Sequence, residues 1–284
     1  MRLVVQGRAI SVAHLTHIHR LIGGNTQFMQ VAEFAYYLPV PAPVHSAGDF
    51  LGVQAFCAEQ QIDYAVVPDA QRLSHFGLCV MDMDSTLISI ECIDEIADMM
   101  QLKPQISAIT ESAMRGEINF STSLIQRVAL LKGLSETALQ QVINERLKLN
   151  SGAQEWIAAC KANNIKTMVV SGGFTFFANH VKALLGLDYA VSNTLEIVDG
   201  KLTGRIVGDI VDADRKAQEL LILREKLALT PDQVIAIGDG ANDLKMMAAA
   251  SIGVAYHAKP IVQEQATYAL NFVGLDGVAN LLTA

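Results

Sequence analysis

The chain has 284 residues, enough for one large domain or two smaller ones, and its 51% hydrophobic content can supply a sizeable core. The formal net charge is −8 and no run of lysine or arginine occurs, which argues against nucleic acid or an anionic membrane surface as the main partner. The four cysteines are widely spread without a C-x-x-C pair, so neither a zinc ribbon nor a thioredoxin-type motif is indicated.

The first residues give no sign of export, because Gln6 and Arg8 interrupt the apolar run too early for a signal-peptide core. No apolar run approaches the length of about 20 residues that is needed to span a bilayer. Widely spaced cysteines are by default reduced thiols of a cytosolic protein. We therefore predict a cytoplasmic protein without a membrane segment.

Residues 1–74 are predicted to form a separate small α/β domain. Pro39, Pro41 and Pro43 interrupt it near its middle. Its β-α-β-α-β order resembles that of the ACT class of amino-acid-sensing domains, which implies a regulatory role. The pattern indicates strands at 3–5, 28–38 and 62–67 and helices at 12–22 and 47–60.

The chain is organised around residues 80–91. An apolar run at 77–81 predicts a short buried strand, which ends in the sequence DMDST with Asp82 and Asp84. Side chains two apart on an extended segment point the same way, so both carboxylates can share a pocket at the carboxyl end of the strand. Two carboxylates held together repel each other, which requires a cation or a shared proton. The plainer alternative, an aspartate that caps a helix, accounts for only one of them.

Residues 97–149 read as a helical insertion with no convincing strand. Ser123 and Gln126 have capping-box spacing and place a helix start near Ser123. Ser135 opens a further helix that runs to about Leu147. Helical spacing shows in the apolar residues Leu124, Ile125, Val128 and Leu131.

From residue 152 the chain alternates helix and strand, as a parallel sheet requires. Polar motifs follow three of the predicted strands, at 82–86, 171–173 and 238–243, and a parallel sheet would bring them to the same edge. The predicted strands are 166–170 and 234–237, the predicted hairpin is 195–203, and the predicted helices are 153–163, 174–185, 214–227 and 241–249.

The residue types at this edge indicate a cation site and an anion site. Asp82 and Asp239 can bind one hard cation whose octahedral shell prefers oxygen, as Mg²⁺ does, and Asp243 follows four residues after Asp239. Ser171 and the two glycines after it offer a hydroxyl and backbone N–H groups to an anion, although a plain turn would read the same. A single lysine at the position of Lys216 is usually solvated. Together with these motifs, Lys216 is a candidate for binding the phosphate.

These parts fit phosphoryl transfer to a carboxylate. Asp82 would attack phosphorus and form an aspartyl-phosphate. The phosphate dianion repels the approaching Asp82 carboxylate, which explains the need for a cation and for Lys216. Asp84 would protonate the leaving alkoxide and then remove a proton from the attacking water. No nucleotide-binding P-loop and no H-E-x-x-H motif occurs in the sequence, and GDGAND lacks the third glycine of a dinucleotide fingerprint.

In this order, DMDST, the SGG loop, Lys216 and GDGAND resemble the haloacid dehalogenase superfamily of phosphatases. The match covers about residues 75–284 and extends to the phosphoserine-hydrolysing members of the superfamily. Further parts of that pattern are Glu91, MRGEINF at 114–120, Arg127, SGGFTFF at 171–177 and IGDGANDLKM at 237–246.

The resemblance implies a role for each matching residue. It makes Asp82 the nucleophile, Asp84 the general acid and base, and Asp82, Asp239 and the Asp84 backbone carbonyl the magnesium ligands, supported by Asp243. Ser171, Gly172, Lys216 and Asn242 would hold the phosphate. Glu91 would face the substrate ammonium and Arg127 its carboxylate, while Met114 and Phe120 would seal the pocket. From the residues alone, a surface side chain is the preferred interpretation of Arg127, while Glu91 is equally a first-turn helix residue, and Met114 and Phe120 could be ordinary core.

The predicted fold class is α/β: a Rossmann-like parallel-sheet core with a helical cap inserted after the first motif, plus the small N-terminal domain. The predicted domains are 1–74, a core of 75–96 and 150–284, and a cap of 97–149. The expected function is magnesium-dependent hydrolysis of phosphoserine to serine and phosphate, the last step of serine biosynthesis. Phosphotransfer from phosphoserine to another alcohol and a purely amino-acid-sensing role are the alternatives, and a homodimer is an open question.

Overall fold

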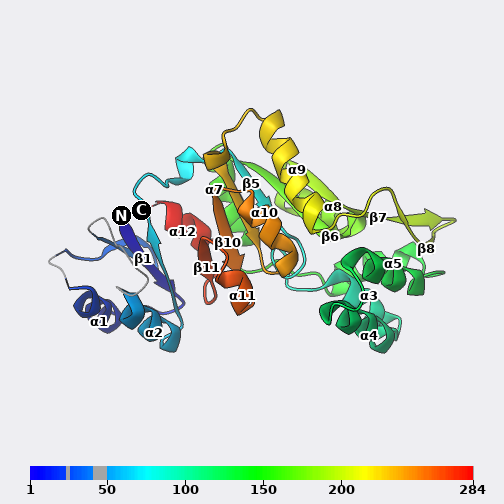
Figure 1. Cartoon of the computed structure of the whole chain (residues 1–284), viewed down its shortest axis with the longest axis horizontal. Coiled ribbons are helices and arrows are strands. Elements are labelled where there is room, and N and C mark those ends of the chain that lie inside the picture. The colour runs from blue at the N-terminus through cyan, green and yellow to red at the C-terminus, as the bar shows by residue number, and fades with distance from the viewer. Residues whose placement is uncertain (24–25, 41–49, 284) are drawn as a thin grey trace.

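The computed structural model describes residues 1–23, 26–40 and 50–283, which form two sheets and a separate group of helices (Figure 1). The smaller sheet and the helical group lie at opposite ends of the long axis, with the larger sheet between them. The two chain ends lie side by side, and Arg2 donates a hydrogen bond to the backbone oxygen of Leu281.

The N-terminal part forms an antiparallel sheet in the order β2-β3-β1-β4, and two helices cover one of its faces. The first helix begins at Ser11, which shares a capping box with His14, and ends before Gly23 in the left-handed region at φ 66°. The elements are β1 (Arg2–Gly7), α1 (Val12–Ile22), β2 (Met29–Ala32), β3 (Ala35–Pro39), α2 (Leu51–Glu59) and β4 (Ile62–Val67).

The prediction of one strand over 28–38 is wrong, because this stretch is the hairpin of β2 and β3. The turn of this hairpin consists of Glu33 and Phe34. Neither is a residue type that is typical of turns, so the sequence does not indicate a turn here. The predicted order β-α-β-α-β is therefore βαββαβ. Pro41, Pro43 and the predicted helix start at residue 47 lie outside the described residues.

The second face of the small sheet packs against the larger unit rather than against solvent. Helix α12 (Gly277–Thr283) contacts β1, β2 and β4. The buried carboxylate of Asp63 on β4 accepts hydrogen bonds from three successive backbone N–H groups, of Asn271 at 2.7 Å, Phe272 at 2.9 Å and Val273 at 3.1 Å. Three donors satisfy a buried carboxylate well, so this contact anchors the N-terminal unit to the core.

The larger sheet has the order β11-β10-β9-β5-β6-β7-β8 and is parallel except for β8, which confirms the predicted parallel core. Its central strand alternates its side chains between two hydrophobic layers, with Cys79 and Met81 on one face and Leu78 and Val80 on the other. The strands are β5 (Leu78–Met81), β6 (Lys166–Phe174), β7 (Tyr189–Val198), β8 (Lys201–Val207), β9 (Val234–Gly238), β10 (Ile252–Tyr256) and β11 (Tyr268–Leu270).

Helices cover both faces of this sheet, as its two hydrophobic layers require. On one face α12 packs beside α7 (Ala153–Ala162), which contributes the fully buried Trp156, and α8 (Thr175–Leu185). On the other face lie α9 (Ala213–Lys226), α10 (Leu244–Ala248) and α11 (Pro260–Gln263). Short 3-10 turns occur at η2 (Leu73–His75), η3 (Pro231–Gln233) and η4 (Ala241–Asp243).

Four further helices form the group inserted between β5 and α7, here called the cap. They are α3 (Cys92–Met99), α4 (Lys103–Met114), α5 (Phe120–Leu130) and α6 (Glu136–Glu145). The predicted start at Ser123 is wrong, because Asn119 caps α5 by accepting the Thr122 N–H at 2.8 Å and thereby starts the helix one turn earlier. The predicted start of α6 at Ser135 is confirmed.

The cap is tied to the hairpin of β7 and β8, which projects from the core sheet toward α5 (Figure 1). The turn of this hairpin is the predicted Asp199-Gly200 pair, with φ of 49° and 71°. Backbone hydrogen bonds of 2.8 Å run from Gly133 N–H to the Leu202 oxygen and from Leu202 N–H to the Leu134 oxygen. The hairpin therefore fixes the end of α5.

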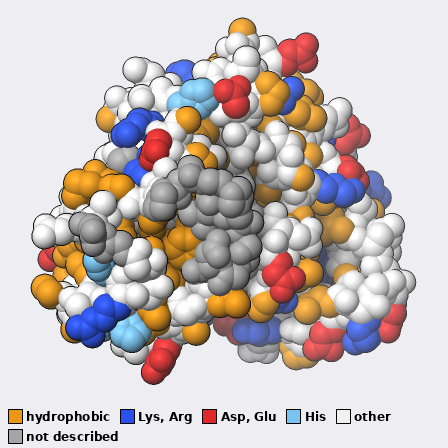
Figure 2. All heavy atoms as spheres, turned by 60° about the vertical axis from the view of Figure 1, so that its left-hand side comes forward, with side chains coloured by type: hydrophobic (Ala, Val, Ile, Leu, Met, Phe, Trp, Pro, Cys, Tyr) orange, Lys and Arg blue, Asp and Glu red, His pale blue; other side chains and the backbone are white. Residues whose placement is uncertain are grey.

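Among the described residues, no helix combines the length and the apolar content needed to cross a membrane. On the face turned forward in Figure 2, acidic and basic side chains are interspersed rather than gathered by sign.

Candidate active site

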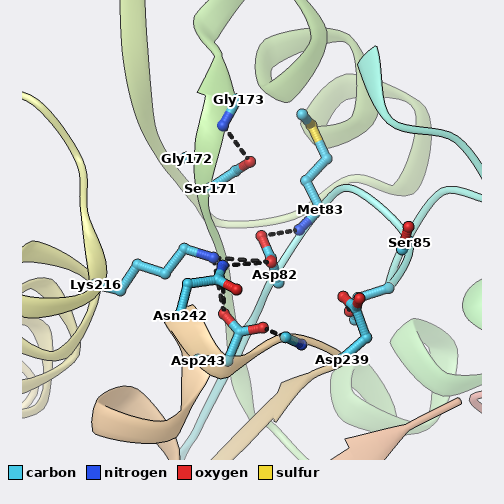
Figure 3. A network of polar contacts seen from close by, with 12 residues as sticks. Asp82, Met83, Ser85, Ser171, Gly172, Gly173, Lys216, Asp239, Asn242 and Asp243 are labelled. Carbon is cyan, nitrogen blue, oxygen red and sulfur yellow. Dashed lines mark hydrogen bonds and ion pairs between the residues drawn. The ribbon is translucent and has the colours of Figure 1, made fainter. Parts of the chain in front are cut away.

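Three adjacent parallel strands bring the predicted motifs together (Figure 3). β5 lies between β6 and β9, so Asp82, Ser171 and Asp239 emerge at the same edge of the sheet. The Ser-Gly-Gly stretch is not the separate loop that was predicted. It is the irregular end of β6, where the register with β7 shifts between Ser171 and Phe174.

A buried ion-pair network forms the centre of the site. One carboxylate oxygen of Asp82, Oδ1, accepts the Met83 N–H at 2.7 Å, and the other, Oδ2, lies 2.8 Å from Lys216 Nζ. Lys216 is only 1% exposed and also donates to Asp243 Oδ1 at 2.8 Å. Burial alone would lower the pKa of Lys216, but the two carboxylates outweigh it and raise this pKa. Lys216 therefore stays charged.

Carboxylate oxygens of Asp82, Asp239 and Asp243 lie within 4.8 Å of one another and could hold a metal ion. Burial, with the charge of Asp82 as second cause, raises the pKa of Asp239 to about 6 and that of Asp243 to about 7. Three oxygen donors that repel one another in a buried site suit a hard cation. The acidic metal-binding cluster expected from the sequence is thus present.

Thr86 and Asn150, to which the sequence analysis assigned no role, hold the loop after β5 in place. Ser85 adopts φ 57°, and Thr86 Oγ1 donates to Asp239 Oδ1 at 2.9 Å. The side-chain amide of Asn150 donates to the backbone oxygens of Ser85, Thr86 and Ile88 at 2.8–3.2 Å. Thr86 could have been suspected from its place in DMDST, but Asn150 lies 64 residues away from Thr86 and carries no local signal.

Asp84 lies in a different environment from Asp82. Its Oδ1 accepts the Cys92 N–H at 3.3 Å. Burial raises the pKa of Asp84 to about 8, and the charges of Glu91 and Asp82 contribute to this rise, so the carboxyl is largely protonated at neutral pH. Glu91 is held toward the same loop by Ser85 Oγ, which donates to Glu91 Oε1 at 2.7 Å. The two aspartates of DMDST thus differ in environment: Asp82 is ion-paired with Lys216, while burial favours the protonated form of Asp84, as a general acid needs.

A cavity of about 410 Å³ lies between the strand ends and the cap. Lys216 and Asp243 do not line it and are buried next to Asp82. Gly173 of the predicted anion-binding motif lines it as well, and so do Ile93, Thr110 and Ser123, which the sequence did not single out as pocket residues. The remaining predicted site residues all line it: Asp82, Asp84, Glu91, Met114, Phe120, Arg127, Ser171, Gly172, Asp239 and Asn242.

The cap contributes one basic and several apolar groups to this cavity. Arg127 donates Nε to the Ser123 backbone oxygen at 3.4 Å and forms no ion pair within 4.0 Å among the described residues. Phe120 lies so close to Gly172 that a methyl group there would meet its Cζ at 2.9 Å. Met114 is 70% exposed at the rim. Arg127 thus offers its terminal nitrogens to a ligand.

The family model of the haloacid dehalogenase-like hydrolases matches residues 76–251. The chain therefore belongs to the haloacid dehalogenase-like hydrolases, which confirms the resemblance found in its motifs. Over almost its whole length it is similar to phosphoserine phosphatases. That of Haemophilus influenzae is 46% identical over 281 residues, which cover 99% of this chain and 88% of the relative.

Two solved structures of phosphoserine phosphatases are similar to this chain in fold and in sequence. A probable phosphoserine phosphatase of Vibrio cholerae in unliganded form has a TM-score of 0.86 at 39% identity, with 99% of this chain and 86% of that chain covered. A substrate-bound phosphoserine phosphatase complex has a TM-score of 0.67 at 37% identity, with 72% of this chain and 96% of that chain covered. The fold class predicted from the sequence is thereby confirmed.

Proposed function

We propose that this protein hydrolyses phosphoserine to serine and phosphate through an aspartyl-phosphate on Asp82. The observation that carries the proposal is the make-up of the 410 Å³ cavity. Asp82 and Asp84 line it and suit a phosphate ester, while Arg127 of the cap and Glu91 just before the cap suit a carboxylate and an ammonium. Phosphoserine carries all three groups.

The chemistry follows from the different environments of the two aspartates. Asp82, paired with Lys216 at 2.8 Å, attacks phosphorus while the alkoxide of serine leaves. Asp84, whose pKa lies at about 8, gives its proton to that alkoxide. The resulting Asp84 carboxylate then takes a proton from the water that hydrolyses the aspartyl-phosphate, which restores both groups.

We further propose Mg²⁺ as the cofactor, held by Asp82 and Asp239 and by the backbone carbonyl of Asp84, with Asp243 in support. When bound, it would neutralise charge on the phosphoryl oxygens as the nucleophile approaches. Thr86 orients Asp239 through the 2.9 Å hydrogen bond, and Lys216 supplies the remaining positive charge. Ser171, Gly172 and Asn242 are positioned to donate hydrogen bonds to the phosphate.

Specificity is proposed to come from the cap. The free terminal nitrogens of Arg127 can bind the substrate carboxylate in the two-point geometry that a guanidinium prefers. Glu91, fixed by Ser85, can accept hydrogen bonds from the ammonium. Phe120, packed close to Gly172, would exclude water from the phosphate end of the cavity, and Met114 would narrow its rim.

We also propose the predicted division into three parts and a cytoplasmic location, in keeping with four unpaired, buried cysteines. The predicted boundary between residues 96 and 97 falls inside α3, so the cap is better taken from Cys92. A purely sensing role would not need the buried network of Asp82, Lys216 and Asp243.

The test is phosphate release from phosphoserine, with Mg²⁺ and with chelator, beside phosphoethanolamine, phosphothreonine and glycerol phosphate. Metal-dependent release that is selective for phosphoserine is expected. Release from the other esters alone would keep the role of Asp82 and overturn those of Arg127 and Glu91. No release from any ester would overturn the proposed function. Adding a competing alcohol and measuring its phosphorylation separates hydrolysis from phosphotransfer.

A further inference from the structure

The loop after β5 is a tight turn whose N–H groups converge on one oxygen. Three successive backbone N–H groups donate to the backbone oxygen of Met83 at 2.9–3.3 Å, those of Thr86, Leu87 and Ile88. Within this turn Ser85 takes the left-handed conformation, with φ 57°. A residue with a side chain keeps such a conformation only where its surroundings hold it, so the turn needs support from outside.

That support comes from one side chain, which binds the oxygens of the same turn. The amide nitrogen of Asn150 lies 3.1 Å from the backbone oxygen of Ser85, 2.8 Å from that of Thr86 and 3.2 Å from that of Ile88. Thr86 is completely buried, so water cannot replace the hydrogen bond to its oxygen. Asn150 thus completes the hydrogen bonding of a turn that contains a left-handed residue.

The backbone of Asn150 is itself fixed beside this turn. Asn150 lies between α6 and α7, where the chain returns from the cap to the core. The two segments that connect cap and core are paired there, since Ser89 N–H donates to the Lys148 oxygen and Asn150 N–H to the Leu87 oxygen, both at 2.9 Å. Only side-chain freedom is therefore lost when the amide binds the three oxygens.

Asp82, just before the turn, is held by other groups. Its backbone N–H donates to the oxygen of Ile237 on the neighbouring strand β9 at 2.9 Å, and its carboxylate is paired with Lys216 at 2.8 Å. Figure 3 shows Lys216 and Ser85 on opposite sides of Asp82. A change at Asn150 should therefore leave the nucleophile in place.

Asp84 depends on the turn more directly. Its backbone leads straight into Ser85, the left-handed residue whose oxygen Asn150 binds. Its carboxyl accepts the Cys92 N–H at 3.3 Å, which is longer than most hydrogen bonds of this type. A shift of the backbone at Ser85 should therefore move the Asp84 carboxyl.

We propose that Asn150 is a positioning residue for Asp84, which holds the turn so that the Asp84 carboxyl reaches the leaving oxygen of the substrate. This inference rests on the proposed function, in which Asp84 gives its proton to the leaving alkoxide. Asn150 does not line the substrate cavity, so it acts through the backbone of the turn. A displacement of about 1 Å at a reacting group can cost about 100-fold in rate.

The test compares esters whose leaving groups differ in their need for a proton. The alkoxides of phosphoserine and phosphoethanolamine need one as they leave, whereas the acetate of acetyl phosphate leaves as a carboxylate. The measured quantity is kcat/KM with Mg²⁺, which compares the transition state with the free protein and substrate. Asp84→Asn, which cannot give the proton, sets the reference: a large fall with both alkyl esters and a small one with acetyl phosphate.

Asn150→Ala removes all three hydrogen bonds and should lower kcat/KM about 10- to 100-fold for both alkyl esters, but less than about threefold for acetyl phosphate. Asn150→Ser keeps one donor and should show the same selective loss to a smaller extent. Asn163→Ala is the matched control, because the Asn163 amide also donates to a backbone oxygen, that of Ala159 at 2.9 Å, but at the end of α7. It should leave all three values unchanged. Activity on acetyl phosphate and circular dichroism show that each variant is folded.

A loss confined to the two alkyl esters, as in Asp84→Asn, supports the proposal. An equal loss with acetyl phosphate would mean that Asn150 supports the whole site, and a loss with phosphoserine alone would mean that it acts through the cap. Either result, or an unchanged kcat/KM, overturns the proposal. If Asp84→Asn itself lowers all three values equally, Asp84 is not the general acid and the inference fails with that assignment. A wild-type protein that hydrolyses none of the esters overturns the proposed function, a result that is distinct from any difference between the variants.

Discussion

The ammonium nitrogen of Lys216 lies 2.8 Å from Oδ2 of Asp82, in a contact that water barely reaches. Because Lys216 also lies 2.8 Å from Asp243, one buried cation offsets two carboxylates. This arrangement holds the Asp82 carboxylate in place for attack, and Asp82, Asp239 and Asp243 together offer oxygens to a metal ion.

Replacing Lys216 by methionine should destabilise the metal-free protein by about 3–5 kcal/mol, because buried carboxylates lose their partner. Urea unfolding with chelator measures the loss, and Mg²⁺ should restore part of it. Lys245→Met is the matched control, since Lys245 forms an exposed ion pair with Asp214 at 2.6 Å and should leave the midpoint nearly unchanged. Equal midpoints for the two variants would contradict the stabilising role of Lys216.

Asp82→Asn should abolish turnover while the protein stays folded, because the amide cannot attack phosphorus but fills the same space. Phosphate release and circular dichroism measure the two effects. Retained phosphate release in a folded Asp82→Asn protein would disprove the nucleophile assignment.

Arg127→Ala should reduce kcat/KM for phosphoserine about 10- to 100-fold, the value of a charge-assisted hydrogen bond, and hardly affect phosphoethanolamine, which lacks the carboxylate. Arg146→Ala is the control within the cap region, because Arg146 forms its ion pairs with Glu95 and Asp98 outside the cavity. An unchanged preference for phosphoserine in Arg127→Ala would show that another group selects the carboxylate.

Gly204 on β8 should position α5 and, with it, Arg127. A methyl group on Gly204 would lie 3.0 Å from Lys132 Cβ and 3.2 Å from the Ala129 oxygen, so it would push the end of α5. Gly204→Ala should raise KM for phosphoserine about three- to tenfold, because small misplacements of binding groups are costly.

Gly208→Ala is the matched control for the backbone cost. Gly208 has φ 80°, close to the 82° of Gly204, but a methyl group on Gly208 would meet no atom within 4 Å. Both variants should lose about 1–2 kcal/mol of stability from the left-handed conformation. If both raise KM equally, the contact with α5 is not what matters.

The metal-free protein should become more stable as the pH falls. The pKa of Asp84 is raised to about 8 and that of Asp243 to about 7, above the unfolded value of about 4. The folded state therefore binds these protons more tightly, and their stabilisation is complete below about pH 4 and is lost as the pH rises through about 7 to 8.

Thermal unfolding with chelator between about pH 5.5 and 8.5 tests this pH dependence. Mg²⁺ should flatten it, because a bound cation favours the ionised carboxylates, and Asp243→Asn should reduce it. A slope that neither Mg²⁺ nor Asp243→Asn changes would assign the effect to other groups.

Much of the site was accessible to sequence reasoning because its groups come in short motifs. Asp82 and Asp84 are neighbours on one loop, and Asp239, Asn242 and Asp243 on another. Covalent spacing alone keeps such residues together, and parallel strands then bring the motifs to one edge. The hairpin hidden in 28–38 was missed because its turn contains no residue with special backbone preferences.

The sequence by itself therefore determined the parallel core and the helical insertion through periodicity, and it predicted the reacting groups through motif spacing. Only the tertiary structure decided how those groups are held: Lys216 between Asp82 and Asp243, Asn150 hydrogen-bonded to the backbone of the catalytic loop, and Gly204 against the end of α5. These contacts join residues far apart in the chain. Their energy depends on burial and distance, which exist only once the layers have packed.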